Sequence, residues 1–392
     1  MIQIRLLRPS TLFLALATIT LAGLPSISTA QLAIPGEPAD PSTLDPVPLK
    51  RERSVAVGKT SVRILVVGDA GIRDGGWLGS SDSSRKAVAA RAREVCSEEP
   101  CDLVLMLGDN LYSKGIRIDN RVEDEEALAG IIHSFLADDE TPVYMVLGNH
   151  DWSSWFIKHS TADRELEWIG SETELDVRGN AHFYEFEAGP VAIWALDTTP
   201  LVRKSSATKD PNLASWLGGI ATSEAPWRVV AAHHPMRSNA GHGNPGTFRD
   251  GPFPFRIWPG KGFRELLDQR IEGVADLYLA GHEHNLQFIS EVAIETPSGT
   301  AAAVVGSASK CTGPGRRFDN PGMELEAYNY GFVIVEATLD RLEISFHLSA
   351  QEGWRAWSAW RTQKSGWQFS TQDPPGTDRA CKQDDSCCPA PQ

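Results

Sequence analysis

The sequence predicts an α/β fold whose buried strands end in polar residues. Runs of apolar, β-branched-rich residues alternate with segments of helix-forming composition through the first half of the chain, and short polar motifs follow most of these runs. Alternation of this kind is typical of a sheet with at least partly parallel strands. Ligands gather at the carboxyl ends of the strands in such sheets, so we expect the polar motifs to meet there.

The predicted elements alternate regularly through most of the chain. Strands are expected at 62–67, 103–107, 143–147, 227–232 and 277–280, and helices at 83–98, 123–137, 212–221 and 262–271. Residues 182–186 and 191–196 are predicted to form a hairpin that turns at Gly189-Pro190. The later predicted strands, at 286–294, 301–305, 332–337 and 342–348, make the second half resemble an antiparallel sheet.

Both ends of the chain are expected to differ from the folded part. Residues 1–30 combine Arg5 and Arg8, an apolar stretch at 12–24 and small residues up to Ala30, which predicts a secretory signal peptide cleaved near Ala30. The alternative, an uncleaved anchor helix, is disfavoured because the stretch is short. Residues 31–54 are a Pro-rich, flexible or extended lead-in, 55–350 form one folded domain, and 351–392 are a Trp- and Cys-rich tail. We expect a secreted or periplasmic protein.

Five motifs carry side chains that bind metal ions in proteins. They are Gly68-Asp69-Ala70-Gly71, Gly108-Asp109-Asn110-Leu111-Tyr112, Gly148-Asn149-His150-Asp151, His233-His234-Pro235 and Gly281-His282-Glu283-His284-Asn285. Any one of them alone is mostly turn chemistry or a surface pair. Together they offer carboxylate, amide, phenol and imidazole donors, which suit zinc, manganese or iron better than calcium. Two such cations can acidify a water and clamp phosphate oxygens, so the joint pattern predicts a dinuclear metallophosphoesterase.

The mature chain is expected to be acidic. Without the two arginines of residues 1–30 it carries 35 Lys and Arg residues against 51 Asp and Glu residues, a net charge of −16. Such a surface repels nucleic-acid polymers and anionic membranes at long range. We therefore expect a small phosphate-ester substrate drawn in by bound cations, no nucleic-acid polymer and no stable membrane insertion after signal cleavage.

All six cysteines lie in the mature part, which predicts disulfides in an exported protein. Cys96 and Cys101 are close enough in sequence to staple the loop before the strand at 103–107. The other four, Cys311, Cys381, Cys387 and Cys388, allow three pairings. A cysteine metal site is disfavoured because no Cys-x-x-Cys pair is present.

The motifs Gly-Asp-Asn-x-Tyr, Gly-Asn-His-Asp, His-x-Pro and Gly-His-x-His-Asn resemble those of the calcineurin-like metallophosphoesterase superfamily. Their finer pattern looks like the purple acid phosphatases of the small, tartrate-resistant type, because Tyr112 stands three residues after Asp109. The resemblance covers roughly residues 61–350. It implies a two-sheet β sandwich flanked by helices, with a dinuclear metal site at the carboxyl edge of the strands.

The resemblance also implies a set of metal ligands. One metal ion would be held by Asp69, Asp109, Tyr112 and His284, and the other by Asp109, Asn149, His233 and His282. Asp109 would bridge the two, and Tyr112 would bind ferric iron and give the protein its colour. The metals would be Fe(III) with Fe(II), Zn or Mn. His233 is preferred to His234 because the family's ligand lies two residues before a proline.

Two further histidines match the catalytic histidines of the family. His150, after Asn149, would contact the phosphate or protonate the leaving group, and His242 resembles a second histidine of this kind. Asp151 is expected to orient His150. A metal-activated hydroxide would attack phosphorus directly, without a phosphoenzyme.

The predicted function is therefore that of a secreted, acid phosphatase-like enzyme that hydrolyses phosphate monoesters. One alternative is a phosphodiesterase or nucleotidase that uses zinc or manganese and leaves Tyr112 idle. A less favoured alternative is a protein that binds a metal or ligand without turnover.

Three features depart from the family pattern or stay open. Ala70 stands where the small type has a bulky aromatic residue, so residues 72–84 are expected to form a distinct rim. Trp152, Trp155 and Phe156 could form an aromatic wall or belong to the core. The Trp cluster of the tail, Trp354, Trp357, Trp360 and Trp367, suggests packing, with a carbohydrate or aryl platform as the alternative.

Overall fold

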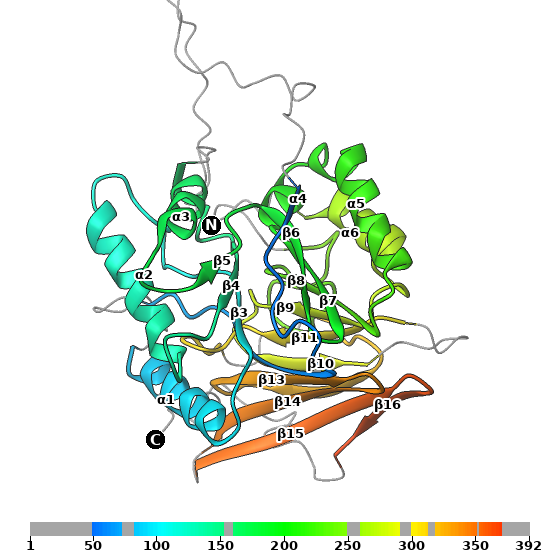
Figure 1. Cartoon of the computed structure of the whole chain (residues 1–392). Coiled ribbons are helices and arrows are strands. Elements are labelled where there is room, and N and C mark those ends of the chain that lie inside the picture. Colours follow the sequence, from blue (N-terminus) through cyan, green and yellow to red (C-terminus); the bar gives the residue numbers. More distant parts are fainter. Residues whose placement is uncertain are drawn as a thin grey trace, which may run out of the picture. The chain divides into compact units, whose positions relative to one another are not determined.

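The computed structural model describes residues 49–72, 82–152, 160–248, 259–290, 299–312, 318–350 and 353–370, whose strands form two sheets (Figure 1). Sheet A contains, in order across the sheet, β1 (Leu49–Arg51), β6 (Phe183–Ala188), β7 (Val191–Leu196), β8 (Trp227–Ala232), β9 (Leu277–Ala280), β11 (Ala301–Val305), β10 (Leu286–Ile289) and β12 (Met323–Ala327). Sheet B contains β16 (Ser365–Phe369), β15 (Gly353–Thr362), β14 (Arg341–Ala350), β13 (Gly331–Thr338), β2 (Ser61–Val67), β3 (Leu103–Leu107), β4 (Val143–Val146) and β5 (Val177–Arg178).

Helices cover the outer faces of both sheets. They are α1 (Asp82–Glu98), α2 (Arg121–Phe135), α3 (Ser160–Ser171), α4 (Thr199–Arg203), the 3₁₀ helix η2 (Ala207–Lys209), α5 (Pro211–Thr222) and α6 (Lys261–Arg270). Residues of α1, α2 and α3 pack on sheet B, and residues of α4, α5 and α6 pack on sheet A (Figure 1). The predicted two-sheet α/β fold flanked by helices is confirmed.

The two sheets share one apolar core. Ile64 of β2 and Leu105 of β3 belong to the same buried cluster as Phe186 of β6 and Val229 of β8. Because successive side chains of a strand point to opposite faces, the neighbouring residues of the same strands face the helices. Leu65 and Val104, for example, pack with the helices on sheet B. Both faces of each central strand are thus buried, as continuous apolar runs predict.

The strands that precede the motifs run parallel within their sheets. In sheet B, β2 pairs with β3 and β3 with β4, all parallel. In sheet A, β8 and β9 are also parallel neighbours. Each of these five strands is followed by one of the five polar motifs, so their carboxyl ends present the candidate ligands together.

The second half of the chain is less antiparallel than expected. The strand at 301–305, β11, runs parallel to β9, although β10 and β12 are antiparallel to their neighbours. Apolar runs do not reveal strand direction, which depends on the path of the connecting chain. The expected strand at 286–294 ends as β10 at Ile289, and residues 291–298 lie outside the described part. Helix α3 and strand β12 were not expected.

Both ends of the described chain join the sheets. Strand β1 lies in the proline-rich lead-in and pairs in parallel with β6. Strand β15 lies beyond residue 350 and pairs with β14 along all ten of its residues, which extends sheet B into the tail. Within the described ranges, no helix is long and apolar enough to cross a membrane. The expected signal peptide at 1–30 lies outside those ranges.

The described cysteines are all bonded. Cys96, at the end of α1, forms a disulfide with Cys101, just before β3, as the short spacing predicted. Cys311 is disulfide-bonded as well. The other cysteines, Cys381, Cys387 and Cys388, lie outside the described residues.

Candidate metal centre

The candidate metal centre lies where the five strand ends meet. Asp69 follows β2, Asp109 follows β3, Asn149 follows β4, His233 follows β8 and His282 follows β9. Hydrogen bonds join the loops that carry them: the backbone N–H of His282 donates to Asp69 Oδ2 (2.7 Å), and that of His150 donates to Asp109 Oδ1 (2.9 Å). The parallel topology therefore gathers residues that are up to 213 positions apart in sequence.

Three of these residues adopt a backbone conformation that is rare for side chains other than glycine. Asp69, Asp109 and His282 have φ values of 56°, 52° and 70°. A non-glycine residue in this region costs on the order of 1–3 kcal/mol and persists only where the surroundings enforce it. Here the conformation turns the chain sharply at the strand end. Strain of this kind concentrates at functional sites, which supports a functional role for this edge.

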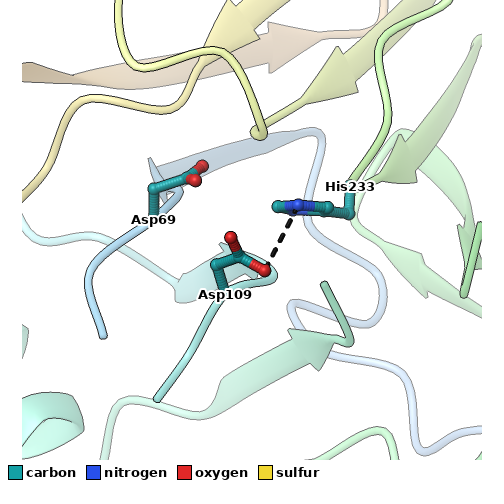
Figure 2. Close-up of side chains that lie close together, drawn as sticks. All are labelled: Asp69, Asp109 and His233. Carbon is teal, nitrogen blue, oxygen red and sulfur yellow. Dashed lines mark ion pairs between the residues drawn. The ribbon is translucent and has the colours of Figure 1, made fainter. Parts of the chain in front are cut away.

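The centre of the cluster is formed by Asp69, Asp109 and His233, whose side chains point toward one another (Figure 2). One possible ligand atom from each lies within 4.8 Å of the others. His233 Nε2 is 3.3 Å from Asp109 Oδ1, and all three residues are buried. Buried carboxylates are costly unless they are paired or coordinate a cation. The trio is thus a candidate cation site on energetic as well as geometric grounds.

The orientation of His233 decides between the two adjacent histidines. Its Nδ1 lies 2.9 Å from the backbone oxygen of Leu107, which can only accept a hydrogen bond, so Nδ1 carries the proton and Nε2 faces the cluster. His234 points elsewhere: its Nδ1 lies 2.8 Å from Thr198 Oγ1. The structure therefore brings His233 to the cluster and leaves His234 beside it.

Asn149 and His282 complete one side of the cluster. Asn149 Oδ1 lies 2.9 Å from His233 Nε2 and 2.9 Å from His282 Nδ1, and these two nitrogens are 3.3 Å apart. The amide oxygen, and His233 Nε2 when His233 is neutral, are both acceptors, so their close approach requires a proton or a cation between them. Burial and the nearby histidine charges hold the pKa of His282 well below its ordinary value. A neutral imidazole is the form that binds metal ions.

Tyr112 and His284 complete the other side. The Tyr112 hydroxyl donates to Asp69 Oδ1 at 2.7 Å and lies 3.3 Å from His284 Nε2, which is itself 3.4 Å from Asp69 Oδ1. Burial and the charges of Asp109 and Asp69 raise the pKa of Tyr112 well above its ordinary value. A bound cation would reverse this effect, because it favours the phenolate.

The donor set fits two metal ions. The set consists of seven side chains, and each has an oxygen or nitrogen atom within 3.4 Å of such an atom of another member. They are Asp69, Asp109, Tyr112, Asn149, His233, His282 and His284. His282 Nε2 is also buried without a hydrogen-bond partner among the described residues. Mixed carboxylate, phenol and imidazole donors suit iron, zinc or manganese.

His150 and His242 lie at the two sides of this cluster and are more exposed than its carboxylate, phenol and imidazole members. Their side chains are 23% and 37% exposed, whereas those of Asp69, Asp109 and His284 are at most 9% exposed. The His150 ring lies 4.7 Å from the Tyr112 ring, and the His242 ring 4.4 Å from that of His282. An incoming molecule would therefore meet these two histidines before the buried donors.

Asp151 does not orient His150, contrary to expectation. Its carboxylate accepts the backbone N–H groups of Gly148 (2.7 Å), Asn110 (2.9 Å) and Leu111 (3.1 Å). Burial and the charge of Asp109 raise the pKa of Asp151 to about 7, against the backbone N–H groups that favour its ionised form. Asp151 thus holds the loops after β3 and β4 together. The His150 ring instead has Nδ1 3.0 Å from the backbone oxygen of Ser113.

Several residues around the site were not singled out in the sequence. Asn110 donates from Nδ2 to Glu165 Oε1 (2.9 Å), which connects the loop after β3 to helix α3. Burial and the charge of Asp151 raise the pKa of Glu165 well above its ordinary value. Glu283 accepts from the backbone N–H of His242 (2.8 Å) and lies 3.0 Å from its Nδ1. Asn110 and Glu283 stand inside the motifs, but no local signal points to Glu165.

Of the three aromatic residues expected to form either a wall or part of the core, only Trp152 lies among the described residues. Trp152 donates from its indole nitrogen to Asp197 Oδ2 (2.8 Å) and stacks on His182, with ring centroids 5.2 Å apart. These contacts make Trp152 part of a polar network around the buried carboxylate of Asp197. Trp155, Phe156 and most of the expected rim at 72–84 lie outside the described residues.

Comparisons with known proteins agree with this geometry. The model of the calcineurin-like phosphoesterase family matches residues 62–286, which span all the predicted ligands. Purple acid phosphatase 17 of Arabidopsis thaliana is 26% identical over 261 residues, 62% of this chain and 68% of that protein. Tartrate-resistant acid phosphatase type 5 of Homo sapiens is 28% identical over 61% of this chain and 72% of its own length. The structure of a purple acid phosphatase from yellow lupin seeds superposes with a TM-score of 0.54 at 16% identity, over 74% of this chain and 51% of that chain.

The two-sheet α/β fold and the matching family model together show the class of the protein, a metallophosphoesterase. The chain belongs to the calcineurin-like phosphoesterase family. The predicted enzyme class, a metal-dependent phosphoric ester hydrolase, is confirmed, and the curated relatives are purple acid phosphatases. A dinuclear metal centre is typical of the family, and the cluster around Asp109 is the candidate for it here.

Proposed function

We propose that the protein is an exported, acid phosphatase-like enzyme that hydrolyses phosphate monoesters. The observation that carries this proposal is the place of Tyr112. Its hydroxyl lies 2.7 Å from Asp69 Oδ1 and 3.3 Å from His284 Nε2, so a phenol belongs to the donor cluster. In the resemblance drawn from the sequence, this tyrosine distinguishes purple acid phosphatases from other dinuclear phosphoesterases.

The seven donors are proposed to hold two metal ions that share Asp109. Asp69, Asp109, Tyr112 and His284 would bind one ion, which a phenolate suits to Fe(III), and Asp109, Asn149, His233 and His282 would bind the other, as Fe(II), Zn or Mn. Bound there, the two ions would acidify a water and neutralise charge on the phosphate oxygens.

The protein's own groups are proposed to hold and move protons beside the phosphate. Because the Ser113 carbonyl engages His150 Nδ1 and Glu283 engages His242 Nδ1, the Nε2 atom of each ring is the one assigned to the substrate. One histidine would donate a hydrogen bond to the transferring phosphoryl oxygens and the other a proton to the leaving oxygen. Glu283 would keep the His242 ring in its orientation through two further bonds, to the backbone N–H groups of His242 and Gly243.

Export is proposed from the N-terminal residues. Residues 1–30 would be removed as a signal peptide near Ala30, leaving the lead-in, the phosphoesterase domain and the tail. The Cys96–Cys101 disulfide supports an oxidising destination, because disulfides persist outside reducing compartments.

A paired rate assay on the purified mature protein tests the proposal. An aryl phosphate monoester and the matching diester are compared from acid to alkaline pH, and the visible spectrum is recorded for wild type and Tyr112→Phe. We expect preference for the monoester below neutrality, together with a visible absorption band that the Tyr112→Phe variant loses.

Two results would overturn it. Preference for the diester or an alkaline optimum, in a colourless protein that contains zinc or manganese, would establish the phosphodiesterase or nucleotidase alternative. Stoichiometric metal without turnover of either substrate would indicate a binding protein. Secretion is tested separately, by the N-terminal residue of the protein recovered outside the cytoplasm.

A further inference from the structure

A lysine that the motifs do not include lies beside the donor cluster. Lys310 belongs to the segment after β11, and its ammonium nitrogen is 5.9 Å from the centre of the Tyr112 ring. The same ring contacts His150, the histidine proposed to meet the phosphate. Lys310 and His150 therefore lie beside the same aromatic side chain at the edge of the centre.

The backbone around Lys310 is bonded to the loops that carry the ligands. On one side, the N–H of Ala308 donates to the Gly68 oxygen (3.3 Å) and the Ser309 hydroxyl donates to the Asp69 oxygen. On the other side, the N–H of Thr312 donates to the His284 oxygen (2.9 Å). Lys310 stands between these anchors, so the position of its backbone depends on that of the donor cluster.

Lys310 brings a positive charge to the edge of a cluster whose buried carboxylates, Asp69 and Asp109, belong to the candidate cation site. Cations bound by these carboxylates and the ammonium group of Lys310 would together attract an anion at this edge. A lysine ammonium is a compact point charge that suits phosphate oxygens.

We propose that Lys310 is a specificity-determining residue that recognises the second negative charge of a phosphate monoester, an inference that rests on the proposed function. A monoester carries about −1.5 to −2 charges near neutral pH, whereas a diester carries one. The ammonium group would therefore stabilise a bound monoester more than a bound diester. Preference for monoesters would arise in part from this chain's own charge and not only from the metal ions.

The test compares Lys310→Met, which keeps the length of the side chain without its charge, with Lys310→Arg, which keeps the charge. Lys59→Met is the control, because Lys59 is a surface lysine paired with Asp102. For each metal-loaded variant, kcat/KM is measured for an aryl phosphate and for the matching diester, together with inhibition by inorganic phosphate. Metal content, visible spectrum and melting temperature are recorded in parallel.

We expect Lys310→Met to lower monoester kcat/KM roughly 10- to 100-fold and diester kcat/KM less than about threefold, the range for loss of one charge-assisted contact. Inhibition by inorganic phosphate should weaken to a similar extent, and Lys310→Arg should recover most of the monoester rate. Metal content should stay that of wild type.

Other outcomes separate the two proposals. Equal losses on both substrates, or loss of metal from Lys310→Met, would show that the lysine only supports the structure and would overturn the inference. Full activity of Lys310→Met with unchanged phosphate inhibition would also overturn it. A wild type that prefers diesters would instead overturn the proposed function, whatever the Lys310 variants do.

Discussion

Two adjacent histidines after β8 have the same burial but different environments. His233 and His234 are both fully buried, yet only His233 directs a ring nitrogen toward Asp109 and Asn149. His234 instead contacts Thr198. The pair therefore offers a matched test of the proposed ligand set within one strand end.

His233→Ala is expected to lose bound metal and to lower activity by more than roughly 100-fold, beyond the usual effect of groups that only orient ligands. His234→Ala should keep its metal and lose about 1–3 kcal/mol of stability, because the buried Thr198 hydroxyl loses its side-chain partner and keeps only the backbone N–H of residue 234. Metal analysis, rate assays and urea unfolding of both variants check this. If His233→Ala retained its metal and His234→Ala lost it, His234 and not His233 would be the metal ligand.

His150→Ala should behave differently from both. A proton donor or phosphate contact contributes roughly 10²- to 10⁴-fold, so turnover should fall by that order while the metal stays bound. The fall should be larger for an alkyl phosphate than for an aryl phosphate, because the poorer leaving group needs the proton more. Unchanged turnover of the alkyl phosphate would remove His150 from the mechanism.

His182 gives a pH-dependent contribution to stability. Its Nδ1 lies 2.7 Å from Asp197 Oδ2 and its Nε2 lies 3.8 Å from Asp163 Oδ1. Burial opposes the imidazolium charge, but the two carboxylates outweigh it and raise the pKa of His182 to about 9. Because the folded pKa is raised above the ordinary value of about 6.5, the stabilisation is complete below pH 6.5. It is lost as the pH rises through 9.

His182→Gln should therefore destabilise the protein by at most about 3 kcal/mol at pH 6, with a much smaller effect at pH 10. Urea unfolding at both pH values measures the difference. His133→Gln, at an exposed position on α2, is the control and should leave stability unchanged at both. A deficit of equal size at pH 6 and pH 10 would mean that packing, not charge, is responsible.

At the scale of elements, the strand ends leave room only for glycine next to the ligands. Gly148, after β4, lies so close to Asp109 that a Cβ atom would overlap the backbone nitrogen and the carboxylate of that residue. Gly108, after β3, has φ +86° and contacts the loop at Gly148. The loops after β3 and β4 thus pack backbone against backbone, and Asp151 bonds to both.

Gly148→Ala is expected to displace Asp109 and to lower metal content and activity, by at least roughly 100-fold in rate, because a misplacement of about 1 Å costs that much. Gly218→Ala, in α5 with nothing within 4 Å of the added Cβ, is the matched control. It should be neutral or slightly stabilising, by up to about 1 kcal/mol. Metal analysis and melting curves of the two variants decide, and a metal-loaded Gly148→Ala would contradict the packing argument.

At the scale of the whole molecule, the shared core extends into the tail. Trp357 of β15 is buried against Phe288 and Phe346, whereas Trp360 of the same strand is partly exposed and contacts Gln368. The packing interpretation of the tail tryptophans therefore applies to Trp357. This part of the tail contributes to the same core as the strands that carry the ligands.

Trp357→Ala should destabilise the protein by about 3–5 kcal/mol, the usual cost of truncating a buried aromatic residue. Trp360→Ala should cost clearly less, because Trp360 is only partly buried and lies outside the shared core cluster. Urea unfolding of both variants provides the comparison. Equal stability of the two, with a changed KM in Trp360→Ala, would favour the platform alternative.

How much could be predicted depends on whether the signal is local. The strands before Asp69, Asp109 and Asn149 were predictable, because continuous apolar runs mark buried strands and the polar motif marks their end. The contact of Asp151 with Asn110 could not be predicted, because it joins the loops after two different strands. No local pattern in the sequence shows how these loops are placed relative to each other. Lys310 and Glu165 were missed for the same reason, since the contacts that make them relevant, with Tyr112 and Asn110, join positions that are far apart in the sequence.

The direction of strands is a further case. A buried strand reads the same in either direction, so β11 could be located but its parallel pairing with β9 could not. The amino-acid composition changes near residue 350, which predicted a domain boundary there. In the structure, β14 continues to pair with β15 across that point.

Local sequence signals were enough to predict the α/β class, the family and the chemical types of donor that the strand ends carry. These properties are local: apolar runs, turn residues and motifs are written in consecutive positions. Three features appear only in the folded protein. Nε2 of His233 faces Asp109, Asp151 joins the loops after β3 and β4 and does not orient His150, and Lys310 lies beside Tyr112. Side-chain orientation depends on groups brought together from distant positions, and only the packing of the two sheets places those groups.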